Sequence, residues 1–248
     1  MLRQILAADG VESLVGRKAG FPLINNPVLM DSGFQYEMAG IELKDPHKLE
    51  FYLGTKVAPR GYLWVFPKGE NKANVGIGII GNSPETAKKY LDDFITKHDR
   101  FSRGSVLEVN AGAIPVGGLM KNMVMNGLIL VGDAAHQVYP IHGGGIGEAI
   151  TAGNMAGKVI WHCIEKGDWS EERLGDYNKL WWDKRGNALA KSEKVRETIE
   201  KMSDEQLNML AASITKDDLM KIVDGNVAIL TKTLLKFGVK NLQKKIFG

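Results

Sequence analysis

Hydrophobic and polar residues follow two different rhythms along this chain. Residues 28–80 alternate between apolar and polar positions, with turn residues between the runs, and this period of two predicts about four antiparallel strands. Residues 4–8 predict one further short strand. The continuous apolar run at 127–131 predicts a strand that is buried on both faces. Another strand-like stretch begins at Ser105.

Helical signals follow the alternating region. Ser83 suits the N-cap and Pro84 the first position of a helix that runs to about His98. A second helix is predicted over about 145–165, directly after a glycine-rich turn. After Asp168 the pattern is helical to the end of the sequence. That part divides into one long helix or two as far as Met202, and then into shorter helices at about 204–212, 216–223 and 225–246.

The composition is that of an ordinary globular protein, and its glycines point to a ligand site. Of 248 residues, 44% are apolar and 25% charged, and many of the 29 glycines cluster in short runs. Such clusters occur where backbone turns sharply or approaches a ligand. The net charge of +3 gives no reason to expect a nucleic-acid partner, and no apolar run is long enough to predict a transmembrane helix. The five histidines lack metal-ligand spacing, so no metal is expected.

The single cysteine, Cys163, lies in the apolar stretch VIWHCIEKG. A lone cysteine makes no intramolecular disulfide, so a reducing, cytoplasmic setting is expected. We interpret Cys163 as a buried structural residue rather than a nucleophile.

The strongest local signal is VGDAAHQVYPIHGGGIGEAITAG, residues 131–153. A buried strand delivers Asp133 to the carboxyl end of a sheet, where a carboxylate can accept hydrogen bonds from a sugar hydroxyl. The glycines after Pro140 then open a helix whose first N–H groups have no partner within the helix. Such a helix start attracts anions and electron-rich groups. The segment therefore predicts a cofactor site rather than an empty turn.

This segment resembles the second FAD motif of flavoproteins related to aromatic hydroxylases. The resemblance implies that Asp133 holds ribityl hydroxyls of FAD and that the glycine run faces the flavin ring and the phosphates. The stretch ILAADGVESLVGRKAG, residues 5–20, resembles the Asp-Gly motif of the same superfamily, which would place Asp9 beside the cofactor. The FAD contacts implied in this way are Asp9, Gly10, Gly132, Asp133, Pro140, Gly143, Gly144, Gly145 and Ile146.

A third segment, YLWVFPKG at residues 62–69, separates subfamilies. Alternation puts its three aromatic residues on one face of a strand, which is usual for a packed core face. The segment also resembles the Tyr-x-Trp-x-Phe-Pro-Lys-Gly motif of geranylgeranyl reductases, which lines the lipid tunnel of that family next to the flavin. The resemblance favours this second interpretation. The isoprenoid contacts that it implies are Tyr62, Trp64, Phe66, Pro67, Gly69 and Gly76.

Residues 76–81 read GIGIIG, a literal GxGxxG. A dinucleotide-binding fingerprint needs a helix that opens within the glycines. Here the helix signal comes later, at Ser83, and the preceding strand belongs to the alternating region. We interpret the segment as a glycine-rich strand to which a ligand or another backbone comes close.

Two further features carry weaker expectations. His136 and His142 flank Pro140 near the predicted flavin, and either is a candidate proton donor or a structural residue of the loop. Near the end of the chain, lysines recur every four residues beside an apolar stripe, which predicts an amphipathic helix with a basic face. Such a face could rest on anionic lipid, although packing on its own domain is the more usual role. The residues concerned are Lys232, Lys236, Lys240 and Lys244, with Leu235, Val239, Leu242 and Ile246.

The resemblance implies a mixed α/β (α+β) architecture. Residues 1–20 and 104–165 would form part of a Rossmann-like FAD-binding domain, 21–103 an antiparallel-sheet substrate region, and 166–248 a helical C-terminal region. In the family a GxGxxG segment precedes the Asp-Gly strand, and in this sequence no such segment stands ahead of the strand at residues 4–8. The strands at 4–8 and 127–131 would then present open edges and apolar faces. Either the enzyme is truncated or split, or a separate chain supplies the N-terminal half, and the chain alone should bind FAD weakly.

The function implied by the resemblance is FAD-dependent reduction of C=C bonds in geranylgeranyl chains of archaeal membrane lipids, with peripheral membrane contact. The reductant is open and could be NAD(P)H, a ferredoxin or another flavin. One rival hypothesis is an aromatic monooxygenase on the same scaffold, which YLWVFPKG disfavours. A second is a remnant or subunit without activity of its own.

Overall fold

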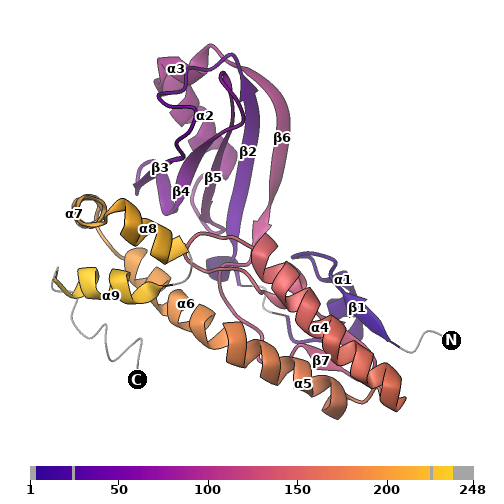
Figure 1. The fold of residues 1–248 in the computed structure, drawn as a ribbon. Coiled ribbons are helices and arrows are strands. Elements are labelled where there is room, and N and C mark those ends of the chain that lie inside the picture. The colour runs from indigo at the N-terminus through magenta and orange to yellow at the C-terminus, as the bar shows by residue number, and fades with distance from the viewer. Residues whose placement is uncertain (1–3, 24–25, 224–225, 237–248) are drawn as a thin grey trace. The chain divides into compact units, whose positions relative to one another are not determined.

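The protein, as a computed structural model, is described over residues 4–23, 26–223 and 226–236, and it divides into two compact units. One unit comprises Pro27–Ile114 and Ile199–Ser213 and is called the sheet unit below. The other, the helix unit, comprises Met1–Asn26, Pro115–Thr198 and Ile214–Gly248. Figure 1 shows the elements of each.

The sheet unit is built on one antiparallel sheet. Its five strands lie in the order β3 (Glu50–Gly54), β4 (Ala58–Pro67), β5 (Lys72–Ile80), β2 (Asp31–Ala39) and β6 (Ser105–Ile114). The alternating pattern between residues 28 and 80 thus gives the four antiparallel strands that it predicts. A short 3₁₀ turn, Pro27–Leu29, precedes β2.

Strand β6 corrects the predicted boundary at residue 104, which assigned it to the FAD-binding part. It pairs with β2 along its whole length, from Asp31 opposite Ile114 to Ala39 opposite Ser105. The reason is topological: β2 lies between β5 and β6, and nothing local in a strand's sequence identifies which neighbour it will find.

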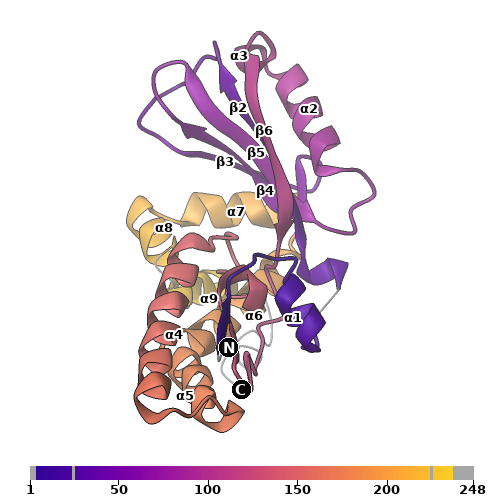
Figure 2. The same ribbon diagram turned by 90° about the vertical axis from the view of Figure 1, so that its right-hand side faces the viewer.

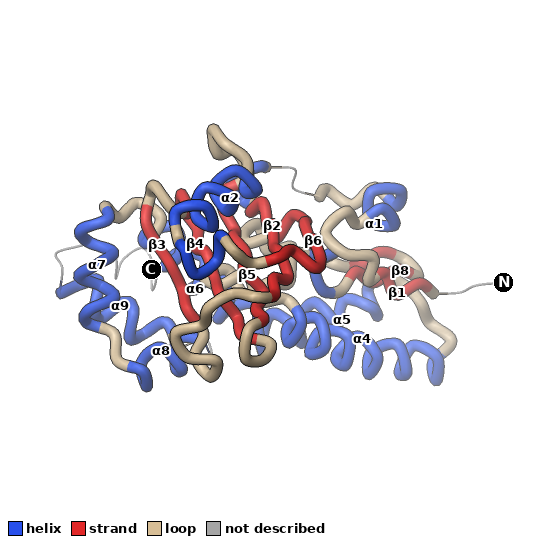
Figure 3. The backbone as a smooth tube through the Cα atoms, turned by 90° about the horizontal axis from the view of Figure 1, so that it is seen from above, coloured by secondary structure: helices blue, strands red, loops and turns tan. Residues whose placement is uncertain are grey.

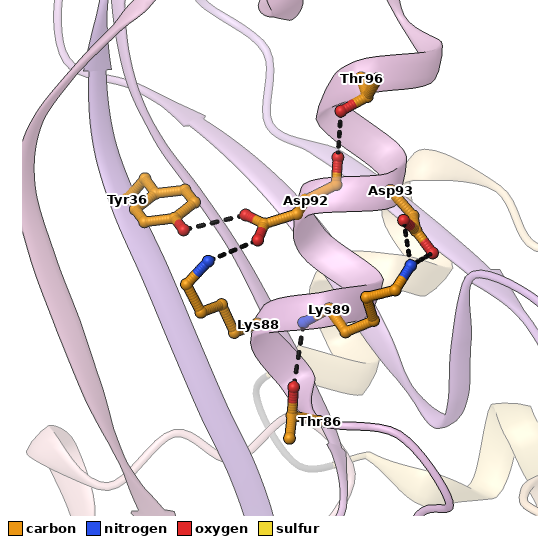
Figure 4. Close-up of polar contacts among 7 residues, drawn as sticks. All are labelled: Tyr36, Thr86, Lys88, Lys89, Asp92, Asp93 and Thr96. Atoms are coloured by element: carbon orange, nitrogen blue, oxygen red, sulfur yellow. Dashed lines mark hydrogen bonds and ion pairs between the residues drawn. The ribbon is translucent and has the colours of Figure 1, made fainter.

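Helix α2 (Ala87–Lys97), followed by the short α3 (Asp99–Ser102), covers one face of this sheet (Figure 2, Figure 3). The helix begins later than predicted, because Thr86 rather than Ser83 is the N-cap and its Oγ1 accepts the Lys89 N–H at 3.2 Å. Figure 4 shows how polar contacts fix the helix to the sheet: the Tyr36 hydroxyl donates to Asp92 at 2.9 Å, and Lys88 pairs with the same carboxylate.

The core of the sheet unit lies between α2, α3 and that sheet face. Alternate residues of β4 and β5 are fully buried there, as the period-two pattern requires. The buried set includes Leu63, Val65, Val75, Ile77, Leu91, Phe94 and Phe101. The opposite face of the sheet, which carries Tyr62, Trp64 and Phe66, remains only partly buried.

Helix α7 (Asp204–Ser213) belongs to the sheet unit, whereas the sequence placed it in a separate helical region. Asp204 accepts hydrogen bonds from the N–H and hydroxyl of Thr55 at 2.8 and 3.1 Å. Arg60 pairs with Glu200 just before the helix. These side-chain contacts hold α7 to the β3–β4 hairpin, and no sequence period encodes them.

The helix unit contains a small sheet in the order β1 (Ile5–Ala7), β8 (Leu128–Leu130) and β7 (Val124–Met125). β1 and β8 are parallel, with Ile5 opposite Leu128 and Ala7 opposite Leu130. The two short apolar runs of the sequence are thus neighbouring parallel strands. Helix α1 (Leu14–Ala19) follows β1, and a 3₁₀ turn (Gly132–Ala135) follows β8.

Long helices complete this unit. α4 (Ile146–Lys166) packs on α5 (Glu171–Trp181), which continues through a π-helical turn (Trp182–Gly186) into α6 (Asn187–Ile199). The helices α8 (Lys216–Val223) and α9 (Val227–Lys236) follow. Cys163 is fully buried between α4 and α5, as predicted. Lys232 and Lys236 are exposed on α9, while the predicted basic positions 240 and 244 lie outside the described residues.

Within the described ranges, no helix combines the length and the hydropathy that a bilayer crossing requires.

Candidate functional site

The parallel pairing of β1 with β8 brings two carboxylates to the same end of the small sheet. Asp9 lies two residues beyond Ala7, the last residue of β1, and Asp133 lies three beyond Leu130, the last residue of β8. In open α/β sheets, ligands bind at the end of the sheet where the carboxyl ends of the parallel strands lie. This end of the small sheet is therefore the candidate site of the helix unit.

The first carboxylate, Asp9, orients the helix that follows it. Asp9 Oδ2 accepts the N–H of Val15 at 2.8 Å, in the first turn of α1. Ser13, the N-cap residue, makes no such bond itself and has positive φ. Gly10 also has positive φ, at 76°, a conformation that costs glycine little. Asp9 is exposed at the strand end.

Helix α1 lies close to β8 because residue 16 is a glycine. A β-carbon there would come within 2.6 Å of Ser13 Oγ and 3.1 Å of Leu130 Cδ1. Ser13 and Gly16 therefore have a packing role. They hold the segment with the Asp-Gly motif against β8, the strand that leads to Gly132 and Asp133, inside the helix unit.

The second carboxylate stands on a turn that a buried side chain holds. Gly132 has φ of 65°, and its N–H donates to Oε1 of Gln137 at 2.7 Å. Gln137 Nε2 donates in turn to the Tyr177 hydroxyl of α5 at 2.8 Å. Both Gln137 and Tyr177 are fully buried. Neither was identified from the sequence, because a buried glutamine within GDAAHQVYP carries no local signal of its partner.

Asp133 itself is half-buried, and burial raises the pKa of its carboxyl group. A β-carbon on Gly145 would lie 2.8 Å from Asp133 Oδ1 and 3.4 Å from a methyl group of Val138. The carboxylate therefore reaches the start of α4 only because residue 145 has no side chain. The structure brings together Gly132, Asp133 and Gly145 as the sequence predicted.

The loop between Asp133 and α4 closes on itself. The Tyr139 N–H donates to the carbonyl of Gly144, and the Gly143 N–H donates to the carbonyl of Tyr139, both at 2.9 Å. Pro140 is buried between them, and Gly143 has φ of 68°. These bonds fix the glycine run before the helix begins.

The two histidines both shape this loop. His136, 2% exposed, has φ of 55° and places Nδ1 3.3 Å from the Gly117 carbonyl. Burial lowers the pKa of His136, which disfavours the charged imidazolium. His142 stacks on Tyr139 with ring centroids 4.3 Å apart, and its Nδ1 accepts the Gly144 N–H at 3.1 Å. Their roles as proton donors stay predictions.

The start of α4 is open in the way that an electron-rich ligand needs. Its N-cap, Gly145, contributes no side-chain cap, so the first-turn N–H groups have no partner from that residue. Ile146, the next residue, is 82% exposed. A half-buried carboxylate, a fixed glycine run and an exposed apolar side chain at a helix start fit the sugar, the backbone contacts and the flat ring of a flavin.

In the sheet unit, the aromatic residues of β4 form a continuous face. Tyr62 and Trp64 have ring centroids 5.6 Å apart, and Trp64 and Phe66 are stacked at 5.9 Å. Phe51 of β3, which sequence reasoning did not include, contacts both Tyr62 and Phe66. Burial raises the pKa of Tyr62 to about 12, which keeps its hydroxyl protonated. The face is partly exposed, as a wall for an apolar ligand must be.

The glycines of GIGIIG lie in this wall. β5 pairs antiparallel with β4 so that Gly78 is opposite Tyr62 and Gly76 opposite Trp64. The segment is a strand and opens no helix, which confirms that it is not a dinucleotide fingerprint. The group that comes close to Gly76 is the Trp64 indole rather than another backbone, and Trp64 Nε1 donates to Gln35 at 3.0 Å.

Pro67 and Gly69, the remaining predicted substrate contacts, end β4 and turn the chain. Pro67 is opposite Ala73 in the ladder, and Gly69 has φ of 137° in the turn before β5. Their structural role is the hairpin itself. Among the described residues, no group of three or more His, Cys, Asp or Glu side chains could hold a metal ion.

Comparison with known proteins gives this geometry a context. Residues 30–114 match the family model of the geranylgeranyl reductase catalytic domain. Over 220 residues the chain is 44% identical to digeranylgeranylglycerophospholipid reductase 1 of Methanococcoides burtonii, a match that covers 88% of this chain and 53% of the relative.

Solved structures agree with this match. A geranylgeranyl bacteriochlorophyll reductase-like protein of Thermoplasma acidophilum superposes with a TM-score of 0.82 and 34% identity, over 93% of this chain and 61% of that protein. A flavin-dependent brominase superposes with a TM-score of 0.62 at 14% identity, which shows the fold alone and confirms the mixed α/β class. The chain thus spans little more than half the length of the proteins that it matches.

Proposed function

The residues that match these relatives belong to the geranylgeranyl reductase family, and from this premise we propose that the chain is the larger part of an FAD-dependent oxidoreductase. The reaction is reduction of C=C bonds in the geranylgeranyl chains of archaeal ether phospholipid precursors. The observation that carries the proposal is the parallel pairing of β1 with β8, which puts Asp9 and Asp133 at one sheet edge before a glycine-opened helix.

The residues of the helix unit would hold the cofactor in distinct ways. Asp133 would accept hydrogen bonds from ribityl hydroxyls, and the first turn of α4 would face the electron-rich part of the ring. Gln137 keeps the Gly132 turn in place beneath them. A bound flavin supplies the hydride in this chemistry. The chain's contribution is to orient the ring and to keep a positive dipole end beside it.

The partly exposed aromatic face of the sheet unit would bind the isoprenoid chain. Tyr62, Trp64, Phe66 and Phe51 offer adjoining rings from two strands. Next to Tyr62 the same sheet face carries Gly78, Gly33 and Gly112, which lie opposite one another on β5, β2 and β6. Of these three glycines, Gly112 is exposed and a β-carbon there would meet nothing within 4 Å, so its backbone offers a surface on which a hydrocarbon chain can lie; at Gly33 the Ile114 side chain already takes that space, with Cδ1 3.2 Å from the β-carbon position.

The substrate class also bears on where the protein works. A phospholipid carrying geranylgeranyl chains resides in a membrane, so a cytoplasmic enzyme must meet it at the bilayer surface. Exposed lysines on α9, Lys232 and Lys236, are compatible with contact to anionic headgroups. Peripheral membrane association is accordingly part of this proposal.

We further propose that an additional polypeptide segment, corresponding to the part of the relatives outside the match, covers open surfaces of both units. In the helix unit β1 is the edge strand and exposes Ile5 and Leu6. α4 exposes an apolar stripe that recurs at helical spacing, formed by Ile146, Ile150, Trp161 and Ile164. A strand of the added segment that runs parallel to β1 would cover the open edge of β1, and a helix after that strand would cover the apolar stripe of α4.

The edge strand of the sheet unit is open as well. Nine of the ten residues of β6 are exposed, among them Val106, Leu107 and Val109. A long apolar edge strand invites pairing with a further strand. Hydrogen exchange tests this directly: adding the unmatched segment of the Methanococcoides burtonii relative should protect β6 amides, whereas self-association would protect them in a concentration-dependent way without that segment.

The experiment for the function uses the same mixture. The chain, the added segment, FAD and dithionite are incubated with digeranylgeranylglyceryl phospholipid in detergent, and the lipid is examined by mass spectrometry. We expect two hydrogen atoms to be gained per reduced double bond, and an Asp133→Leu variant to lose both flavin and turnover. A mixture that binds FAD but leaves the lipid unchanged would contradict the proposed reaction.

Two control arms decide between the alternatives. The chain without the added segment should bind FAD weakly and give no product, whereas tight stoichiometric binding would show that the segment is dispensable. NADPH-driven oxygen uptake with a phenolic substrate tests the monooxygenase hypothesis, which distant similarity of fold supports.

A further inference from the structure

Glu148 occupies a position from which a glutamate usually caps its own helix. The N-cap of α4 is Gly145, so Glu148 is the third residue of the first turn. A glutamate there commonly folds back and accepts the N–H of the N-cap residue, and the positive helix end attracts its charge. The carboxylate of Glu148 goes elsewhere: Arg185 Nε donates to Oε2 at 3.0 Å, and Arg185 Nη2 donates to Oε1.

The arginine reaches α4 from the π-helical turn between α5 and α6. A π turn inserts one extra residue into an α-helix and so changes the direction of the side chains within it. Tryptophans lock this turn: Trp181 is fully buried, and Trp182 Nε1 donates to the Met120 carbonyl at 3.2 Å. A β-carbon on Gly186 would come within 2.6 Å of both indoles, so the two tryptophans pack tightly against this glycine.

The pair is largely shielded from water on the carboxylate side. The Glu148 side chain is 8% exposed and that of Arg185 is 33% exposed. A buried carboxylate that loses its partner finds another donor or takes up a proton, because leaving it charged and unpaired is strongly unfavourable. The N–H groups at the start of its own helix are donors that a glutamate in this position commonly reaches, and Tyr139 also interacts electrostatically with the pair.

We propose that Arg185 is a positioning residue, which holds the Glu148 carboxylate away from the start of α4 and so keeps the N–H groups of that first turn available to the flavin. The proposal rests on the proposed flavin site. The π turn is then the element that links the α5–α6 helix to the cofactor. The carboxylate would otherwise compete with the flavin for the same positive helix end.

The contact can be tested without any flavin. In ¹⁵N-labelled protein, the amide shifts of Gly145 and Ile146 are followed while the pH is lowered through the range in which carboxyl groups titrate. Asp133 lies beside Gly145, and its carboxyl group titrates in both proteins. We expect Arg185→Met to give these amides a second, large titration that the unsubstituted chain lacks, because Glu148 now accepts from them. The Arg185→Met/Glu148→Gln double variant should lose that titration. Unchanged amide titration in Arg185→Met would overturn the proposal.

Flavin affinity gives the second readout. By FAD fluorescence, Arg185→Met should weaken binding about tenfold, and the double variant should recover most of that loss, since the competing carboxylate is gone. A purely structural role predicts the opposite, with the double variant at least as impaired. Arg185→Lys keeps the charge without the two-pronged contact and should lie between, and it remains informative if Arg185→Met does not fold.

A matched control separates this contact from general effects of charge. Arg173 of α5 has a half-exposed side chain and reaches carboxylates only at 3.9 Å. Arg173→Met should change neither the amide titration nor FAD affinity. If the amides behave as expected but the unsubstituted chain shows no FAD binding even with the added segment, the placement of Glu148 by Arg185 stands and the proposed function fails. FAD binding by the unsubstituted chain together with an unchanged amide titration in Arg185→Met would overturn the role of Arg185 alone.

Discussion

The indole of Trp64 lies against Gly76, so closely that a β-carbon on residue 76 would come within 2.4 Å of Cζ2. The two residues are directly opposite on β4 and β5. The glycine therefore sets where the tryptophan lies, and the tryptophan in turn supports Tyr62 and Phe66 on either side.

Substitution Gly76→Ala should displace the indole and destabilise the sheet unit. Overpacking of this kind costs about 1–3 kcal/mol. Urea unfolding followed by tryptophan fluorescence measures it. Gly112→Ala is the matched control, because Gly112 is a strand residue of the same sheet and a β-carbon there meets nothing within 4 Å. Equal losses in the two variants would contradict the contact.

The buried link between Gln137 and Gly132 should be necessary for stability. Gln137→Leu leaves the Gly132 N–H and the Tyr177 hydroxyl without their buried partner, at a cost of about 1–3 kcal/mol for each unsatisfied group. Tyr177→Phe removes one hydroxyl and should cost less. Thermal unfolding compares the two, and a larger effect for Tyr177→Phe would be inconsistent with Gln137 as the centre of the network.

Glu50 should make the sheet unit sensitive to acid. Hydrogen bonds from Arg100, at 2.8 and 2.6 Å, lower the pKa of Glu50 from its ordinary 4.5, and Tyr52 also donates to it. Because the folded-state pKa is the lower one, the stabilisation is complete above 4.5 and is lost as the pH falls through the folded-state pKa.

The comparison that checks this is Glu50→Gln against the unsubstituted chain. The variant should be less stable at neutral pH, and the difference should shrink below the folded-state pKa, where Glu50 is protonated in both states. A difference that persists unchanged in acid would mean that the ion pair with Arg100 contributes no pH-dependent stability.

Gly145→Ala should weaken FAD binding while the chain still folds. The added methyl group would meet Asp133 Oδ1 at 2.8 Å and force the carboxylate to move. Gly153→Ala, in the same helix and with nothing within 4 Å, is the control, and it should leave FAD affinity unchanged. Differential scanning calorimetry and FAD fluorescence on both variants distinguish a lost site from a lost fold.

Much of this fold could be predicted because its signals are local. The period-two alternation of β2 to β5 and the continuous run of β8 identified the strands, and the glycine run identified the start of α4. The Asp-Gly and Gly-Asp motifs lie directly after the two strands that pair in parallel, β1 and β8. The predicted N-cap at Ser83 was wrong because Thr86 offers a better-placed acceptor.

What sequence reasoning missed depends on contacts between distant segments. The partners of β6, the attachment of α7 through Asp204, and the Gln137–Tyr177 bond join residues far apart in the chain. The π turn at Trp182–Gly186 is also invisible to periodicity, because one extra residue barely alters a helical pattern.

The most direct measurement of the central claim is a titration of the ¹⁵N-labelled chain with FAD, followed by amide shifts into the millimolar range so that weak binding is seen. We expect saturable shifts at Asp9, Gly10, Gly132, Asp133 and the glycine run from Gly143, and we expect Asp133→Leu to lose them. Shifts confined to other parts of the molecule, or the same shifts in Asp133→Leu, would contradict it.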